Sequence, residues 1–259
     1  MTQEQLSFIT HVAQGKPETI VHHDAACPFC DVAHLTNILA QEADRIWLVN
    51  KFRVLADTMQ TIIIESSNHQ GDWSNYDAAT GAAIMDFSLR KWTEMRHDAH
   101  YRSVMMYKNF GPRSGGSLSH PHLQIVGLDK IDGYAHIRPE NLAGDAFLQL
   151  GEATVSIATE PVQGFLEFNV RIPSSQSAAD LSDAIRVLTH YVLNGYFHGR
   201  CDSYNLFFYP TDDGIVCKVV PRFNASPFTV GYLVPQVFQA DRIAEIEQEV
   251  TKFVHSYLK

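Results

Sequence analysis

Two histidines separated by a single residue, His120 and His122, are the side chains in this sequence best suited to group-transfer chemistry. A neutral imidazole is a good nucleophile near pH 7 and a good leaving group once it is protonated. It can therefore carry a phosphoryl group for a short time. We assign the role of nucleophile to His122. The competing interpretation is a half-buried strand with two structural histidines, but the residues on either side favour the chemical one.

A loop rich in glycine and serine, residues 111–119, precedes the histidines, and its glycines are Gly111, Gly115 and Gly116. Glycine lets successive backbone N–H groups turn toward one point and form a concave site for an anion. Arg113, inside this loop, could bind a phosphate group through two parallel hydrogen bonds. The loop is therefore expected to hold a phosphate beside the nucleophile.

The loop is expected to join two strands, over residues 102–110 and 120–128, because both segments are rich in strand-forming residues. Alternation along the second strand would place the side chains of His120, His122 and Gln124 on one face. A rigid strand face suits a nucleophile that must attack phosphorus in line with the leaving group.

The other predicted elements repeat one order along the chain. Apolar runs predict strands over 45–52 and 58–66, and helical periodicity predicts a helix over 76–100. After a break near 140–150, similar patterns predict strands over 152–159, 164–172, 204–209 and 215–220, and helices over 178–197 and 240–258. We therefore predict an α+β protein with two duplicated halves, residues 1–145 and 146–259, each an antiparallel sheet with a packed helix.

Composition and charge exclude several classes of function. A formal net charge of −9 argues against a general nucleic-acid binder, which needs a basic surface for phosphate contacts. No apolar stretch approaches the roughly 20 residues of a membrane helix. The polar N-terminus lacks the apolar core of a signal peptide, so we expect a cytoplasmic protein that does not bind membranes.

Four cysteines divide into a close pair and two separate residues. Cys27 and Cys30 form C-P-F-C, a spacing typical of a zinc site or a redox pair. Disulfides are rare in the cytoplasm. Cys201 and Cys217 lie in apolar, strand-like runs, and we expect them to be buried core thiols.

One continuous pattern joins the loop and the histidines: Asn109, Gly111, Gly115, Ser117, His120, Pro121, His122 and Gln124. It resembles the active-site motif of galactose-1-phosphate uridylyltransferases and related transferases and phosphorylases of the histidine-triad superfamily. The resemblance implies two histidine-triad-like halves, the first catalytic and the second degenerate. It implies that His122 becomes covalently nucleotidylated, that Gln124 holds a phosphate oxygen, and that Asn109 and Ser117 contact the diphosphate.

The resemblance also implies a metal site and a nucleoside site. Cys27 and Cys30 match the family's zinc pair, while His69 and His120 match its third and fourth ligands. Two cysteines and two histidines form a tetrahedral set suited to structural zinc. The residues at the end of the first strand resemble the family's nucleoside-binding segment, and they are Asn50, Lys51 and Phe52.

Parts of the family pattern are missing from this chain. The second-half histidines that bind another metal in uridylyltransferases correspond to Tyr209, Val216 and Lys218, so we expect no second metal. The arginine-rich N-terminal segment of those enzymes is absent, and the chain is shorter than theirs. The sequence therefore leaves the base, the sugar and the acceptor open.

Three hypotheses remain after the motifs are considered. The first is a transferase or phosphorylase that takes a nucleoside diphosphate-sugar or a dinucleotide and a phosphorylated acceptor, as a homodimer if it follows the family. The second is a nucleotide hydrolase, which Gln124 disfavours because an amide cannot act as a general acid or base. The third is a non-catalytic nucleotide-binding protein, against which the intact His122 argues.

Overall fold

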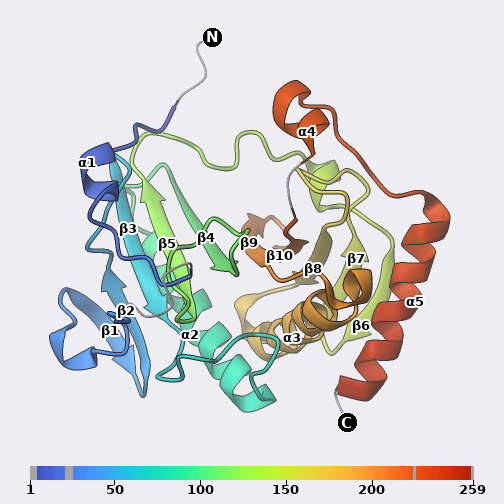
Figure 1. Cartoon of the computed structure of the whole chain (residues 1–259), viewed down its shortest axis with the longest axis horizontal. Coiled ribbons are helices and arrows are strands. Elements are labelled where there is room, and N and C mark those ends of the chain that lie inside the picture. The colour runs from blue at the N-terminus through green and yellow to red at the C-terminus, as the bar shows by residue number, and fades with distance from the viewer. Residues whose placement is uncertain (1–4, 21–25, 224–225, 258–259) are drawn as a thin grey trace.

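A computed structural model describes residues 5–20, 26–223 and 226–257. Within these ranges all ten strands belong to one antiparallel sheet, and the main helices cover one face of it (Figure 1). The strands are β1 Ile38–Glu42, β2 Arg45–Val49, β3 Thr58–Ile64, β4 Ser103–Phe110, β5 His122–Leu128, β6 Ala146–Leu150, β7 Ala153–Ile157, β8 Phe168–Ile172, β9 Tyr204–Thr211 and β10 Gly214–Pro221. The α-helices are α1 Thr10–Ala13, α2 Ala78–Arg96, α3 Ala178–Asn194, α4 Pro227–Tyr232 and α5 Ala240–Tyr257. Short 3₁₀ turns are η1 Val32–His34, η2 Pro139–Leu142, η3 Ser175–Ser177 and η4 Tyr196–Gly199.

The strand order shows that the chain is built from two similar halves. The order is β1-β2-β3-β5-β4 in the first half and, read from the other edge, β6-β7-β8-β10-β9 in the second. The halves meet where β4 pairs with β9, so that one sheet runs through both. This confirms the predicted α+β fold with two antiparallel halves.

Each half has one more strand than the sequence predicted. The two unpredicted strands, β1 and β6, are the outermost strands of the sheet. The residues of β1 are exposed apart from Ala40, which is half-buried. Edge strands of this kind carry little of the alternating burial that marks a strand in the sequence. The prediction over 45–52 was also too long, because β2 ends at Val49.

Two long helices pack against the same face of the sheet and against each other. Asp77 caps the N-terminus of α2, because its carboxylate accepts a hydrogen bond from the Thr80 N–H. The apolar face of α2 is fully buried, with Ile84, Phe87 and Trp92 all at 0% exposure. The last helix, α5, lies alongside the second half and contacts α3 (Figure 1).

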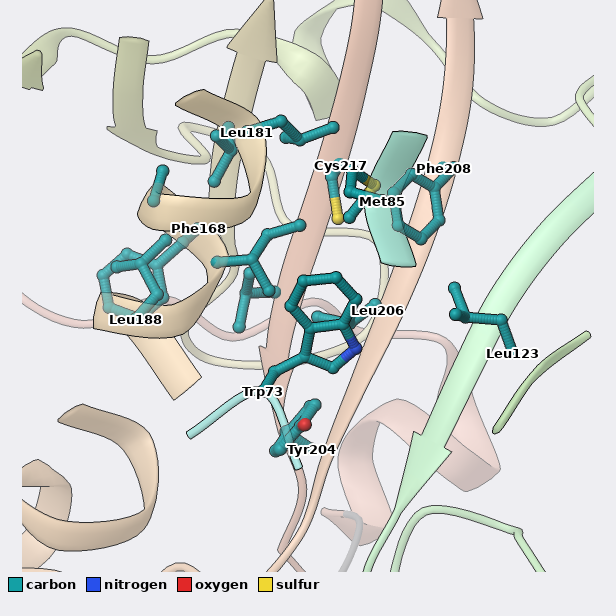
Figure 2. Packing of buried hydrophobic residues seen from close by; sticks show 14 of the residues in the cluster. Trp73, Met85, Leu123, Phe168, Leu181, Leu188, Tyr204, Leu206, Phe208 and Cys217 are labelled. Atoms are coloured by element: carbon teal, nitrogen blue, oxygen red, sulfur yellow. The ribbon is translucent and has the colours of Figure 1, made fainter. Parts of the chain in front are cut away.

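The main hydrophobic core fills the space between these helices and the sheet. Figure 2 shows part of it, where Leu206 and Phe208 of β9 and Cys217 of β10 lie near Met85 of α2. Cys217 and Cys201 are 0% and 2% exposed, so the structure places both as the buried core thiols expected. Since Leu123 on β5 points into this core, its neighbours His122 and Gln124 lie on the opposite face.

The strand register relates the two halves residue by residue. At the β4–β9 junction Tyr107 lies opposite Phe207. On the next strands outward, Gln124 lies opposite Tyr107 and Lys218 lies opposite Phe207. Lys218 therefore occupies the place in the second half that Gln124 occupies in the first.

The same register places Val216 where the first half has His122. Lys218 is buried, and its Nζ lies 2.9 Å from a carboxylate oxygen of the equally buried Glu167. The second half thus has an aliphatic residue and an ion pair where the first has a histidine and an amide.

Among the described helices, none is long and apolar enough to cross a membrane.

Candidate active site

Four side chains predicted to bind a metal converge at one point. The ligand atoms of Cys27, Cys30, His69 and His120 all lie within 4.8 Å of one another. The Cys30 Sγ lies 3.2 Å from His69 Nδ1 and 3.5 Å from His120 Nδ1, and the Cys27 Sγ lies 3.7 Å from His120 Nδ1. Tetrahedral zinc with bonds of about 2.3 Å to sulfur and 2.0 Å to nitrogen separates such atoms by roughly 3.5 Å. The cluster therefore has the donor set and the spacing that a zinc ion requires.

The other ring nitrogen of His120 fixes the orientation of this ligand. Its Nε2 lies 2.9 Å from the backbone carbonyl oxygen of Ser66, so Nε2–H donates and Nδ1 faces the two thiols. Metal-binding histidines are commonly held in this way by an acceptor on the far nitrogen.

The prediction that His120, His122 and Gln124 share one strand face was wrong for the first of them. The strand β5 begins at His122, two residues later than predicted, and His120 lies in a bend before it. Pro121 lies between them and has no N–H to offer to a strand ladder. The ring of Phe29 lies edge-on to both imidazoles, at 5.8 Å from His120 and 5.4 Å from His122.

The backbone holds His122 in the tautomer that a nucleophile needs. Its Nδ1 lies 2.8 Å from the carbonyl oxygen of His120, which can only accept, so Nδ1 carries the proton and Nε2 has the free lone pair. Burial lowers the pKa of His122 to about 4, with smaller contributions from the charges of Lys108 and Lys16. The imidazole is therefore neutral at physiological pH.

His122 lies in the wall of a pocket that encloses about 260 Å³ on the face of the sheet away from the helices. The pocket brings together most of the site residues predicted from the sequence, namely Asn50, Lys51, Phe52, Asn109, Gly116, Ser117, His122 and Gln124. Asn50 makes a tight turn after β2, because its Oδ1 accepts a 2.8 Å hydrogen bond from the Phe52 N–H. Both residues line the pocket.

A tyrosine that the sequence did not indicate orients Gln124. The Tyr107 O–H donates a 3.1 Å hydrogen bond to Gln124 Oε1. Burial raises the pKa of Tyr107 to about 12, so its hydroxyl stays protonated and able to donate. Since the carbonyl end of Gln124 is occupied by Tyr107, its NH₂ end is the part left to face an anion in the pocket.

The junction between the halves also holds Asn109. The Asn205 Nδ2, from β9, donates 2.7 Å to Asn109 Oδ1 and 3.1 Å to the Ser114 carbonyl oxygen. The second half therefore helps to shape the loop of the first. Gly111 is required here, since it has φ +82° and a Cβ would lie 2.2 Å from the Asp202 carbonyl oxygen.

The structure does not bring Arg113 and Gly115 to the pocket. The guanidinium group of Arg113 pairs with the carboxylate of Asp202, and the backbone N–H of Arg113 donates to Ser203 Oγ at 3.0 Å. The Gly116 N–H is directed to Ser114 Oγ at 3.3 Å. Two N–H groups of the predicted anion concavity are thus used inside the protein, and the pocket lining takes in only the later part of the loop, residues 116–118.

A cation that the sequence analysis missed, Lys16, lines the pocket beside the nucleophile. Its segment is tied to the loop, because the Thr19 N–H donates 2.8 Å to the Ser117 carbonyl and the Ser119 N–H donates 2.9 Å to Thr19 Oγ1. Burial lowers the pKa of Lys16 from its ordinary value. Lys16 belongs to none of the motifs in the sequence, so its place in the pocket emerges only from the fold.

Comparisons with known proteins place the chain in a family. Residues 8–131 match the family described as "Domain of unknown function (DUF4931) N-terminal domain", and residues 134–254 match the corresponding C-terminal domain. A solved DUF4931 family protein from Bacillus cereus ATCC 10987 is 37% identical, with a TM-score of 0.75, over 83% of this chain and 98% of that chain. No curated protein sequence matches this chain significantly.

Two more distant solved structures share the fold. An ADP-glucose phosphorylase from Arabidopsis thaliana with bound ADP-glucose is 14% identical, with a TM-score of 0.69, over 93% of this chain and 94% of that chain. A uridylyltransferase is also 14% identical, with a TM-score of 0.69, over 91% of this chain and 93% of that chain. These likenesses show that the chain has the same fold as a uridylyltransferase and an ADP-glucose phosphorylase.

Proposed function

This chain belongs to the DUF4931 family, and we propose that it is a nucleotidyltransferase or phosphorylase that works through a nucleotidyl group bound covalently to His122. Its substrates would be a nucleoside diphosphate-sugar or a dinucleotide, and a phosphorylated acceptor. One observation carries the proposal. The buried, neutral His122 presents the Nε2 lone pair to a pocket that Lys16, Lys51 and the Gln124 amide also line.

The proposed reaction has two displacement steps at the same phosphorus atom. In the first, His122 Nε2 attacks the α-phosphorus, a P–N bond forms, and the P–O bond to the second phosphate breaks. That phosphate leaves with both electrons of the bond. In the second, an oxygen of the acceptor phosphate attacks, a new P–O bond forms and the imidazole leaves.

The residues around His122 would support both steps without moving protons. The Nδ1–H bond to the His120 carbonyl stabilises the ring as it gains positive charge in the adduct. Lys16 and the Gln124 NH₂ group are placed to stabilise the negative charge on the phosphoryl oxygens. The base and ribose would contact the rim formed by Asn50 and Phe52.

Zinc belongs to the proposal as a structural ion. Cys27, Cys30, His69 and His120 would hold it, and it would supply a rigid anchor next to β5. Because the carbonyl oxygen of His120 accepts a hydrogen bond from His122 Nδ1–H, an anchored His120 would also fix the nucleophile. The homodimer that the family resemblance implies is likewise part of the proposal.

The test is intact-mass measurement after incubation with a panel of nucleoside diphosphate-sugars and dinucleotides. We expect one substrate to add the mass of a single nucleoside monophosphoryl group, and a phosphorylated acceptor to remove it. His122→Ala should show no added mass and should still bind the same substrate. Turnover of at least a tenth of the wild-type rate by His122→Ala would show that the mechanism is not covalent at this residue.

A further inference from the structure

A fully buried lysine lies on the face of the sheet opposite the pocket. Lys108 on β4 is 0% exposed and shares a face with the core residue Met106. Its Nζ lies 2.6 Å from Glu65 Oε1 and 4.0 Å from Asp72 Oδ1, and both carboxylates are buried as well. Replacing a buried ion pair by uncharged residues often leaves stability unchanged, so stability alone does not explain these charges.

The two carboxylates mark the ends of one segment, residues 65–72, which we call the metal-ligand segment. It begins directly after β3 and contains His69, one of the four residues of the metal cluster. It also contains Ser66, whose carbonyl oxygen lies 2.9 Å from His120 Nε2. Lys108 therefore contacts both ends of a segment that supplies one metal ligand and orients another.

A backbone hydrogen bond connects the first end of this segment to the nucleophile. The Glu65 N–H donates 3.2 Å to the carbonyl oxygen of Pro121, which lies between His120 and His122. The carbonyl oxygen of His120 in turn accepts the hydrogen bond of His122 Nδ1–H. A shift of Glu65 would therefore move the start of β5, where His122 lies.

The other oxygens of the two carboxylates are also hydrogen-bonded. The Tyr76 O–H donates 3.0 Å to Glu65 Oε2, and the Ser74 N–H donates 3.0 Å to Asp72 Oδ2. From β9 in the second half, the Tyr204 O–H donates 2.5 Å to Asp72 Oδ1. A buried polar network whose members are all satisfied makes its surroundings rigid.

The second half also holds the chain just beyond Asp72. The Ser74 carbonyl oxygen accepts hydrogen bonds from His190 Nδ1–H at 3.1 Å and from the Tyr257 O–H at 3.0 Å. His190 lies on α3, and Tyr257 is the last residue of α5. The far end of the metal-ligand segment is thus fixed against three elements of the second half, which otherwise has no part in the metal cluster.

We propose that Lys108 is a positioning residue for the active site, which acts by binding both ends of the metal-ligand segment. The segment then holds His69 and His120 at the spacing that a metal ion requires. The backbone bond to Pro121 holds the start of the strand that carries His122. The effect on chemistry rests on the proposed function, whereas the effect on metal binding does not.

The test compares two double variants that remove similarly buried ion pairs. Lys108→Met with Glu65→Gln removes the pair at the metal-ligand segment, and Asp72 keeps its bonds from Tyr204 and Ser74. The control, Lys218→Met with Glu167→Gln, removes the pair of the second half. Both variants lose one positive and one negative charge, so their net charge is unchanged. Urea unfolding shows whether each is folded.

The first measurement is the binding of Co²⁺, which is titrated into protein freed of zinc by a chelator and followed by its visible absorption. The Lys108→Met, Glu65→Gln variant should bind Co²⁺ roughly tenfold to a hundredfold more weakly than the wild type, as found when the outer partners of metal ligands are removed. The control should bind it as the wild type does. Backbone amides of residues 65–72 should exchange with deuterium faster only in the first variant.

Glu65→Gln alone is a milder variant that keeps the shape of the side chain and its bond to Lys108. It should weaken Co²⁺ binding about fivefold, because a charge-assisted hydrogen bond is roughly twice as strong as a neutral one. This variant decides the question if the first double variant does not fold. An unchanged affinity in Glu65→Gln would then overturn the proposal.

Three other results would overturn the proposal. The first is a wild type that binds no Co²⁺. The second is equal affinity in the wild type and the folded Lys108→Met, Glu65→Gln variant. The third is an equal loss of affinity in both double variants, because metal binding would then follow general stability rather than the metal-ligand segment.

Adduct formation with saturating zinc separates this proposal from the proposed function. The Lys108→Met, Glu65→Gln variant should form the adduct roughly tenfold to a hundredfold more slowly at saturating donor, the effect of a misplaced nucleophile. The donor concentration for half the maximal rate should change little, since neither residue lines the pocket. A change confined to that concentration would contradict a positioning role. If no donor forms an adduct with the wild type but the Co²⁺ pattern holds, the proposed function fails and the role of Lys108 at the metal cluster stands.

Discussion

The hydroxyl group of Tyr107 on β4 donates a 3.1 Å hydrogen bond to the side-chain carbonyl of Gln124 on β5, and this bond decides which end of the amide faces the pocket. An amide that turned freely would present its oxygen to the phosphate as readily as its NH₂ group. Strand β4 thus orients the residue that follows the nucleophile by two positions on β5.

Tyr107→Phe should lower the rate of adduct formation about tenfold, since one neutral hydrogen bond contributes roughly 0.5–1.5 kcal/mol. The variant keeps the ring, so its melting temperature should change little. Stopped-flow measurement of the first step, with the donor at saturation, tests the prediction. An unchanged rate would mean that the orientation of Gln124 has no part in the chemistry.

Gln124→His should raise the ratio of hydrolysis to transfer. An imidazole at this position could accept a proton from water, which an amide cannot do. The lifetime of the covalent adduct in buffer without acceptor is the measurement, and it should be shorter in the variant than in the wild type. Gln124→Asn, which keeps an amide, is the control and should not shorten it. An equally stable adduct in Gln124→His would show that something other than Gln124 excludes water.

One zinc ion per chain is expected in protein purified without chelator, as measured by elemental analysis. The double variant Cys27→Ser, Cys30→Ser should bind no zinc. The Cys201→Ala variant, which changes a buried thiol outside the cluster, should still bind one zinc ion per chain. Loss of the metal should lower the melting temperature more than it lowers the rate of the first step, because zinc here anchors the chain. A double variant that keeps its zinc would disprove the ligand set.

Lys16→Ala should raise the Michaelis constant of the donor roughly tenfold or more, because a hydrogen bond to a charged group contributes about 1.5–3 kcal/mol. Arg113→Ala should have a smaller effect, since its guanidinium group pairs with Asp202 and does not line the pocket at His122. Lys130→Ala, which removes a lysine paired with Asp57 at the surface, is the control. If Arg113→Ala has the larger effect, the loop must rearrange when substrate binds.

Glu167→Gln should destabilise the protein at pH 7 by about 3–5 kcal/mol, because it leaves the buried Lys218 without its partner. Burial alone would raise the pKa of Glu167, but attraction to Lys218 and hydrogen bonds from the backbone N–H groups of Gln163 and Gly164 hold it below its usual value. A carboxylate whose folded pKa is lowered stabilises the fold above its unfolded pKa. That contribution is lost as the pH falls through the folded pKa.

The difference in urea midpoint between wild type and Glu167→Gln should therefore be largest at neutral pH and should narrow below about pH 4.5. Glu160→Gln removes a carboxylate paired with Arg138 at the surface. It should lower the free energy of unfolding by less than about 1 kcal/mol. A difference that stays constant from pH 7 to pH 3 would show that the charge of Glu167 does not support the fold.

The sequence alone was sufficient for features that depend on neighbouring residues. Helical periodicity predicted α2, α3 and α5, and alternating or apolar runs predicted the eight inner strands to within a few residues of their ends. The spacing of His120, His122 and Gln124 indicated the kind of chemistry. The motif also named Cys27, Cys30, His69 and His120, which the fold brings within 4.8 Å of one another.

Only the tertiary structure could supply the residues that join distant segments. Tyr107 became relevant through its strand partner Gln124, and Lys16 through its segment, in which Thr19 bonds to a loop 100 residues away. The edge strands β1 and β6 escaped prediction because each pairs on one side only and buries few side chains. Arg113 lies outside the expected site because of a contact between distant segments. Its partner Asp202 lies 89 residues further along the chain, and local spacing carries no information about contacts at that distance.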